Sequence, residues 1–237
     1  IVQLLRKLET DEREQLLAAF PAERAEELKK RLAEIIEIPP ALMDEILRGE
    51  CVLLLGAGIS IEAGMPSSKQ LVGALGCDPA RVSLPDAATR FKQEKGRGKL
   101  IKAIQREFAS ARAYRKPGSF PVIVSTSQLN SLIVTTNWDT ALEEEFKAEG
   151  IEPLIVKRDV ELSLITRKDH VVVKLHGDLN NPDTLVVTRG DYDMMRRKLL
   201  EPIGFGGFLA TLMTTRTLIF IGYSMGDEDF KLLRDAW

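Results

Sequence analysis

Apolar residues follow two patterns along this chain. Short, mostly apolar runs, which are typical of strands buried on both faces of a parallel sheet, occur at residues 51–55, 132–135, 171–175, 185–187 and 218–221. Between these runs, apolar positions often recur every three or four residues, as on one face of an amphipathic helix. The alternation predicts an α/β fold: a Rossmann-like, doubly wound parallel sheet with helices on both faces.

The first forty residues differ from the rest. Apolar residues recur there at helical spacing among dense charges, until Pro39 interrupts the pattern. A further short helix is predicted at residues 41–47. We therefore expect an N-terminal helical segment at residues 1–40, which either caps the domain or contacts a partner, and a main domain at residues 41–237.

Several helices are expected within the main domain. One is predicted over residues 60–75 and another over 140–148. Residues 85–113 have the pattern of helical segments interrupted at 95–99, where glycines and positive charges suit a solvated loop or a mobile lid. The composition of residues 117–131 fits a strand as well as a helix.

The first apolar run ends in a glycine-rich turn. Gly56, Gly58 and Ser60 lie within five residues, so the backbone can bend tightly and a phosphate can approach its N–H groups without meeting a Cβ. The dinucleotide-binding fingerprint would need a third glycine where the chain has Ile61, and the Walker pattern is absent. The turn is thus either a phosphate-binding loop or a tight strand-to-helix connection that binds nothing.

Polar residues follow three further apolar runs. They are Thr136, Asn137 and Asp139 after the second run, His176 and Asp178 after the third, and Gly222 and Ser224 after the last. Ligands of open α/β sheets bind beyond the carboxyl ends of the strands, so we expect these residues to meet at one crevice. Simpler explanations exist for each, because Asn and Asp often cap helices and a lone histidine often closes a strand.

Composition narrows the range of functions. The chain has 237 residues, of which 44% are hydrophobic and 29% charged, and its net charge of −2 offers no overall attraction for nucleic acid or an anionic membrane. It has no run of eighteen apolar residues and no signal peptide, so we expect a cytoplasmic protein. Cys51 and Cys77 form no Cys-x-x-Cys pair, so no metal site is expected. Residues 227–237 have the pattern of an unfinished helix, which predicts a fragment of a longer polypeptide.

Four segments together resemble the sirtuin family of NAD-binding proteins, and in particular its sirtuin-like NAD-hydrolase branch of bacterial antiphage defence. The matching segments are Gly56-Ala-Gly-Ile-Ser60 with Gly64-Met-Pro66, Thr135-Thr-Asn-Trp-Asp139, Leu175-His-Gly-Asp178 and Gly222-Tyr-Ser224. Their order and spacing match over residues 45–230. A helix that begins at a proline precedes the second motif in that family, so the resemblance favours a helix from Pro121 onward.

The resemblance implies a role for each matched residue. Asn137 and Asp139 would lie beside the nicotinamide ribose, and His176 would be the catalytic base. The other matched residues would bind the rest of NAD; they are Gly56, Ala57, Gly58, Ser60, Gly64, Pro66, Thr136, Gly222, Tyr223 and Ser224. Cleavage of the glycosidic bond builds positive charge on the ribose, which requires accurate positioning and an electron-rich neighbour.

Two departures from protein-deacylating sirtuins bear on the activity. Their Asp-Phe-Arg run after the first motif is replaced by Ser67-Ser-Lys69, and their four-cysteine zinc module is missing. The resemblance therefore implies an NAD hydrolase that releases nicotinamide and ADP-ribose, or cyclic ADP-ribose. Such an enzyme would deplete NAD as the toxic effector domain of an antiviral defence protein, causing abortive infection. NAD is then a substrate, and further domains or subunits, or a homo-oligomer, are the expected partners.

Two other functions remain open. A non-catalytic module could sense NAD or ADP-ribose, although the pair Asn137 and His176 argues against it, because a sensor needs neither. A zinc-free deacylase or ADP-ribosyltransferase would have to build its peptide groove from residues 76–120.

Overall fold

The computed structural model describes residues 15, 17, 18, 21, 22, 25, 26, 29, 38–113, 115–127, 131–166, 170–224 and 228–235. By its internal contacts the chain divides into two units, Ile1–Asp44 and Glu45–Trp237. Most of the helical segment predicted for residues 1–40 lies outside the described residues. The short helix predicted at 41–47 is confirmed as α4, Pro40–Leu47.

The second unit is built on a sheet of five parallel strands in the order β3-β4-β2-β1-β5. The strands are β1 Cys51–Leu55, β2 Leu132–Thr135, β3 Leu154–Val156, β4 Val171–Lys174 and β5 Thr217–Ile221. The chain passes from β1 to β2 on one side, and β5 later pairs with β1 on the other side. β1 therefore lies at the switch point of the sheet, the place where open α/β sheets bind their ligands.

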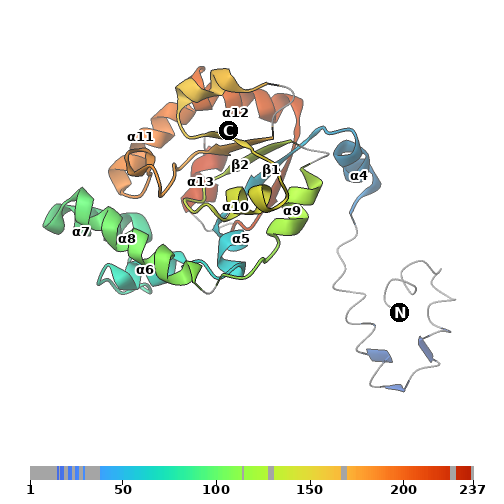
Figure 1. The fold of residues 1–237 in the computed structure, drawn as a ribbon, viewed down its shortest axis with the longest axis horizontal. Helices are drawn as coiled ribbons and strands as arrows, with labels where there is room; N and C mark the ends of the chain where they lie inside the picture. Colours follow the sequence, from blue (N-terminus) through green and yellow to red (C-terminus); the bar gives the residue numbers. More distant parts are fainter. Residues whose placement is uncertain are drawn as a thin grey trace. The chain divides into compact units, whose positions relative to one another are not determined.

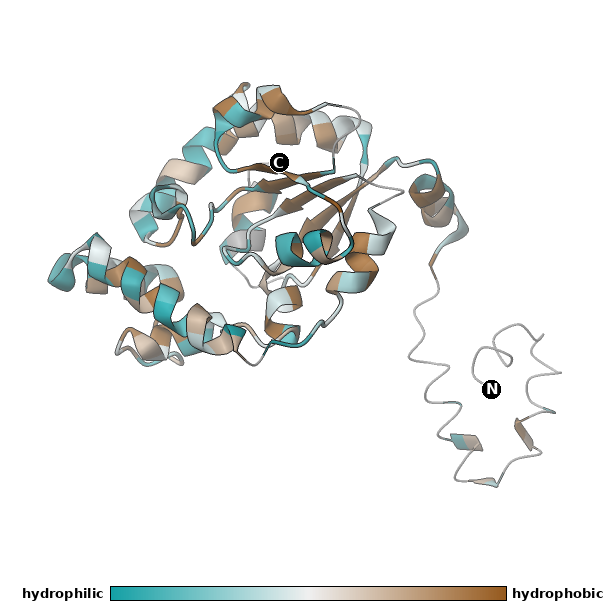
Figure 2. Cartoon of the chain, viewed as in Figure 1, coloured by the Kyte–Doolittle hydropathy of each residue, from teal (hydrophilic) through white to brown (hydrophobic). Residues whose placement is uncertain are grey.

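Helices cover both faces of the sheet (Figure 1). One face is covered by α5 Ala57–Glu62, α9 Phe120–Thr126 and α10 Ala141–Ala148. The other face is covered by α11 Arg189–Leu199, α12 Gly204–Thr215 and α13 Glu228–Asp235. Neighbouring residues of one strand, such as Leu54 and Leu55, pack into opposite cores. The strands are accordingly hydrophobic over most of their length (Figure 2), and the predicted Rossmann-like α/β fold is confirmed.

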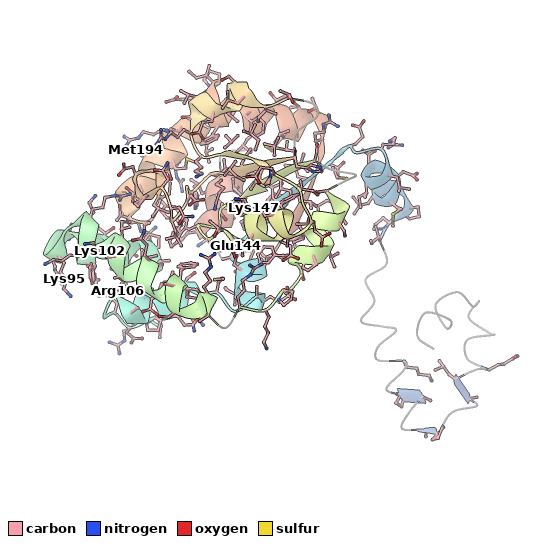
Figure 3. All side chains as sticks on the ribbon, viewed as in Figure 1. Lys95, Lys102, Arg106, Glu144, Lys147 and Met194 are labelled. Carbon is pink, nitrogen blue, oxygen red and sulfur yellow. The ribbon has the colours of Figure 1, made fainter. Side chains whose placement is uncertain are left out.

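Three further helices form a separate group near the carboxyl ends of the strands. They are α6 Ser68–Ala74, α7 Leu84–Lys95 and α8 Arg97–Arg112. Their apolar sides pack on each other and on Trp138 and Leu179, which follow β2 and β4. The outer side of this group carries charge, including Lys95, Lys102 and Arg106 (Figure 3). The group thus supplies a wall at the end of the sheet where the predicted site residues lie.

The helix predicted over residues 60–75 is wrong, because two helices occupy this stretch. α5 already starts at Ala57, and the chain turns at Gly64, whose φ of 96° lies in the region that favours glycine. α6 then starts behind Ser67, which forms a capping box with Gln70. Ser60 is therefore inside α5 and not at its start.

The remaining helix predictions have mixed outcomes. The helical segments expected within residues 85–113 form α7 and α8, but the loop expected at 95–99 is wrong, because Gly96 alone separates the two helices, with a φ of 86°. The helices predicted from Pro121 and over 140–148 are confirmed as α9 and α10. Among the described residues no helix is long and apolar enough to cross a membrane.

The strand predicted at residues 185–187 is also wrong. Within the part of the chain that the structure describes, this run pairs with no strand; it follows the 3-10 helix η2 Pro182–Thr184. Its residues are apolar because they fill two cores at once: Leu185 and Val187 pack among α6–α8, and Val186 packs against α11 and α12. The sequence pattern instead missed β3, a three-residue edge strand that is followed by the 3-10 helix η1 Asp159–Leu164.

Candidate functional site

A cleft of about 510 Å³ opens at the carboxyl ends of β1 and β2. Its polar side comes from α5 and from the loop after β2, and its apolar side from α6, α7 and α8. Among its lining residues are Ala57, Ser60, Pro66, Leu71, Val72, Ser83, Leu84, Phe108, Thr136, Asn137, Trp138, Asp139, Tyr192, Ser224 and Glu228. The volume lies in the range of small-molecule and cofactor sites, and the mixture of apolar walls with few polar groups is typical of them.

The glycine turn after β1 interlocks with the end of β5. Gly58 N–H donates to Gly222 O at 2.8 Å, and Gly56 N–H donates to Ile221 O at 2.8 Å. A Cβ on Gly58 would lie 2.8 Å from Gly222 Cα, so only glycine permits this approach. Gly56 and Gly58 accordingly form the support of the cleft, while Ala57 and Ser60 of the same turn line it.

Asn137 is held in one orientation at the cleft. Its Nδ2 donates to Gly56 O and to Ser60 Oγ, both at 3.0 Å, and a carbonyl oxygen can only accept, which determines which end of the amide faces the turn. Its Oδ1 is buried and has no hydrogen-bond partner among the described residues. Because a buried unpaired acceptor is costly, this oxygen is suited to a donor that a ligand or water brings.

Asp139 has two functions in the structure. Its Oδ1 accepts a hydrogen bond from the N–H of Ala141 at 3.0 Å, so it caps the start of α10 as its residue type allows. Its side chain is half-buried and also lines the cleft. The capping explanation and the site explanation are therefore compatible.

His176 lies close to the site but does not line the cleft. Its side chain is nearly fully buried, with 1% of its surface exposed. The ring of Tyr192 from α11 packs edge-on against it, with the centroids 5.3 Å apart, and Tyr192 is the residue that lines the cleft. Sequence reasoning missed Tyr192, because nothing in a charged amphipathic helix distinguishes an aromatic residue of the site from one of the core.

The other predicted site residues are also brought to this end of the sheet. Tyr223 Oη donates to Leu55 O at 3.2 Å and lies 3.2 Å from Thr136 Oγ1. These two contacts join the ends of β1, β2 and β5. Ser224 is exposed and lines the cleft. Gly64 forms the turn after α5 and is not among the lining residues.

A buried charge cluster behind the cleft was not anticipated. It comprises Lys174, Glu143, Asp178 and Lys157, and we refer to it as the Lys174 cluster. Lys174 Nζ donates to Glu143 Oε1 and to Asp178 Oδ2, both at 2.8 Å, and Lys157 Nζ lies 3.9 Å from Asp178 Oδ2. Burial alone would lower the pKa of Lys174, but the two carboxylates outweigh it and raise that pKa, so the ammonium stays charged. Burial raises the pKa of Glu143, although Lys174 opposes it. A lysine inside the otherwise apolar run 171–175 was the available signal in the sequence.

The rim of the cleft carries a second ionic cluster. Arg189 at the start of α11 binds Asp86 with two hydrogen bonds of 2.7 and 2.9 Å, and it also contacts Ser83 and Glu228. The hydrogen bond from Arg189, and next that from Ser83, lowers the pKa of Asp86 to about 2. This cluster joins α7 to α11 beside the lining residues Ser83 and Glu228.

Thiols and metal ligands contribute little to this picture. Cys51 is buried in β1, where burial raises the pKa of its thiol, and Cys77 is half-buried. Within the described ranges no three His, Cys, Asp or Glu side chains are grouped so that they could hold a metal ion.

Comparison with known proteins agrees with the motifs found at this cleft. Residues 131–236, which include the ends of β2, β4 and β5, match the family model of the SIR2-like domain. Over these residues the chain is similar to a SIR2-like domain. The glycine turn of β1 lies outside the matched range, but it is bound to β5 inside it.

Curated relatives extend this likeness over most of the chain. The chain is 26% identical over 219 residues to the NAD(+) hydrolase ThsA of Enterococcus faecium, a match that covers 86% of this chain and 41% of that protein. The likeness to the NAD(+) hydrolase ThsA of Acinetobacter baumannii is 26% over 204 residues, covering 81% of this chain and 40% of that protein. The chain thus spans about two fifths of the length of these relatives.

Proposed function

We propose that this chain hydrolyses NAD at the bond between nicotinamide and ribose. The observation that carries the proposal is the position of Asn137: its amide is oriented by Gly56 and Ser60, and its buried Oδ1 has no hydrogen-bond partner among the described residues at a cleft of cofactor size. Relatives that match most of the chain are named NAD(+) hydrolases, which supports the same activity.

Each side of the cleft suits one part of NAD. We infer that the pyrophosphate and adenosine lie along Ala57, Ser60 and Ser224, and that the nicotinamide ribose lies beside Asn137 and Asp139. The glycines of the β1 and β5 turns bring these backbones together without side chains of their own. The apolar wall from α6 to α8 would exclude water from the flat ring of the base.

The proposed reaction needs little acid catalysis. When the bond from ribose C1′ to the nicotinamide nitrogen breaks, its electron pair neutralises the pyridinium ring, so nicotinamide leaves as a neutral molecule. The ribose becomes oxocarbenium-like in the transition state, and an oriented carbonyl oxygen and a nearby carboxylate stabilise that charge. In the proposal these groups are Asn137 Oδ1 and Asp139.

Water completes the reaction by bonding to C1′ through its oxygen. It loses one proton, for which we assign His176 as the base, because imidazole accepts protons at neutral pH. A hydroxyl or base of the same NAD molecule can replace water, and the product is then cyclic ADP-ribose. Because His176 is buried beside Tyr192, the packing around it has to open when NAD binds.

The assignment of a toxic effector in antiphage defence is part of the same proposal and has only the family resemblance as support. Partners among further domains, subunits or second copies of the chain belong to it as well.

The deciding experiment measures nicotinamide release from NAD by the full-length protein, with Asn137→Ala as the variant. We expect the variant to release nicotinamide about 10²- to 10³-fold more slowly, because removing one oriented group that stabilises a transition state has an effect of this size. Asn180→Ala is the matched control, because Asn180 is an exposed asparagine of the loop after β4. A protein that binds NAD and releases no nicotinamide would instead be a sensor of NAD.

A further inference from the structure

We propose that Lys174 is a positioning residue of the cleavage reaction. It holds the loop after β2, which carries Asn137 (the Asn137 loop), at a fixed position relative to the loop after β4, which carries His176 (the His176 loop). The inference rests on the proposed function, since it concerns the same site. Lys174 itself is not among the residues that line the cleft; it acts through the backbone and side chains that it binds, among them the main chain of the lining residue Asp139.

The first argument is that Lys174 has every donor engaged. Its side chain is 1% exposed, and an ammonium has three N–H groups. Two of them bind Glu143 Oε1 and Asp178 Oδ2 at 2.8 Å, and the third binds the main-chain oxygen of Asp139 at 2.6 Å. A fully bonded ammonium cannot rotate freely, so its three partners are held at fixed distances from one another.

The second argument is where these partners lie in the chain. Asp139 O belongs to the loop after β2, two residues beyond Asn137. Asp178 is four residues beyond Lys174, and His176 lies midway between them. The neighbouring hydrogen bond from Leu179 N to Trp138 O at 3.0 Å joins the same two loops. One buried cation therefore connects the two segments that carry the candidate catalytic side chains.

The third argument is the cost of this arrangement. A buried ammonium with two carboxylates loses its hydration, and an apolar side chain at the end of β4 would fill the space more cheaply. Lys157 adds a second positive charge at 3.9 Å from Asp178, so the Lys174 cluster is electrically balanced. The arrangement thus trades stability for a defined geometry, which a reaction that depends on positioning requires.

The first test is Lys174→Met in the full-length protein, which keeps the side-chain length and removes the ammonium. We expect kcat for nicotinamide release to fall about 100-fold, the loss that a displacement of about 1 Å can cause. The Kd for ADP-ribose should change less than kcat, because in the proposal its pyrophosphate and adenosine lie along Ala57, Ser60 and Ser224, and only its ribose lies beside the segment that Lys174 binds. The matched control is Lys157→Met, which removes a charge of the same cluster without touching Asp139; it should keep kcat.

Lys174→Met alone leaves Glu143 buried without its partner and can unfold the protein. The double variant Lys174→Met/Glu143→Leu removes both charges, and apolar replacements of buried ion pairs are often neutral for stability. Asp178 keeps the N–H of Asn180 at 2.7 Å and the charge of Lys157. Recovered thermal stability with kcat still low supports a positioning role. Recovery of both would show that Lys174 serves stability alone and would overturn the proposal.

A spectroscopic readout separates this inference from the proposed function. With 5-fluorotryptophan incorporated, the ¹⁹F resonance of Trp138, assigned by its loss in Trp138→Phe, reports the position of the Asn137 loop without turnover. We expect the resonance to shift in the double variant and to stay in Lys157→Met. If the wild-type protein releases no nicotinamide, the proposed function fails, and an unshifted Trp138 resonance then overturns the role of Lys174 separately.

Discussion

The ends of β2 and β4 carry the two candidate catalytic side chains and present them differently. At the end of β2, hydrogen bonds from Asn137 to Gly56 and Ser60 orient a side chain that already lines the cleft. At the end of β4, packing beside Tyr192 covers His176, of which only 1% is exposed. If the chain binds NAD as we propose, one half of the site is formed beforehand, and the other half has to open.

The largest expected effect comes from removing His176. His176→Ala should lower kcat for nicotinamide release by about 10² to 10⁴, the usual contribution of a general base, and leave ADP-ribose binding intact. His170→Ala is the control, because the chain has two histidines and His170 lies against Ser127 and Phe146. The measurement is nicotinamide released per folded protein. If His176→Ala and His170→Ala lose the same activity, His176 is not the base and the comparison fails.

The second-largest effect is expected from removing the ring of Tyr192, which packs against His176. Tyr192→Ala should cost about 1 to 3 kcal/mol of unfolding free energy, as loss of a half-buried ring does, and should speed the modification of His176 by diethyl pyrocarbonate. Tyr192→Phe keeps the ring and should leave the modification slow. Mass spectrometry locates the modified histidine. The same slow modification in all three proteins would show that Tyr192 does not control access.

The third prediction concerns the half of the site that is already formed. Gly58→Ala places a Cβ 2.8 Å from Gly222 Cα, which should destabilise the fold by about 1 to 3 kcal/mol in denaturant unfolding and weaken the turn that orients Asn137. Gly73→Ala in α6 meets open space and should stabilise by about 0.5 to 1 kcal/mol. If Gly58→Ala is as stable as the wild type, the turn can adapt, and Asn137 is then not held in one orientation in the absence of a ligand.

The smallest effect is expected at the rim. The pKa of Asp86 in the folded protein is about 2, below its value near 3.9 in an unfolded chain. A lowered pKa stabilises the fold above the unfolded value, and that contribution disappears as the pH falls from about 4 towards about 2. The side chains of Arg189 and Asp86 are 40% and 43% exposed, so the contribution should stay below about 1 kcal/mol.

The measurement is the difference in unfolding free energy between wild type and Asp86→Asn across this pH range. We expect it to shrink as the pH falls. Arg189 is three residues before Tyr192 in α11, so this experiment also measures how much the ion pair with Asp86 stabilises the helix that packs against His176. A difference that persists at the acid end would place the stabilising partner elsewhere.

Much of the fold could be predicted from local patterns. β1 is a continuous apolar run because both of its faces are buried, and β5, whose residues are half-buried, continues as an apolar run after Thr217; the sequence shows both runs directly. The run at 185–187 looked the same for a different reason, since Leu185 and Val186 fill two separate cores. A short edge strand such as β3 leaves no pattern, because three residues between polar neighbours are too few.

The candidate site divides in the same way. The residue types after each strand were sufficient to predict that Asn137 and His176 lie at the same edge of the sheet, because parallel strands bring their carboxyl ends to one edge; that only Asn137 lines the cleft was not predicted. The sequence alone did not show why position 58 must be a glycine, because its close contact with Gly222 joins residues that are far apart in the chain. Tyr192 and Arg189 were missed, since a helix surface does not show which of its side chains face a cleft.

The sequence by itself therefore determined the parallel α/β architecture, the motif residues and the edge of the sheet where they gather, because these follow from periodicity and from chain order. Only the tertiary structure decided that Asn137 is presented to the cleft while His176 is covered, and that Lys174 ties their loops together. The physical reason is that exposure and hydrogen bonding at a site depend on segments brought together from α5, α11 and the strand ends, and local sequence does not record those distances.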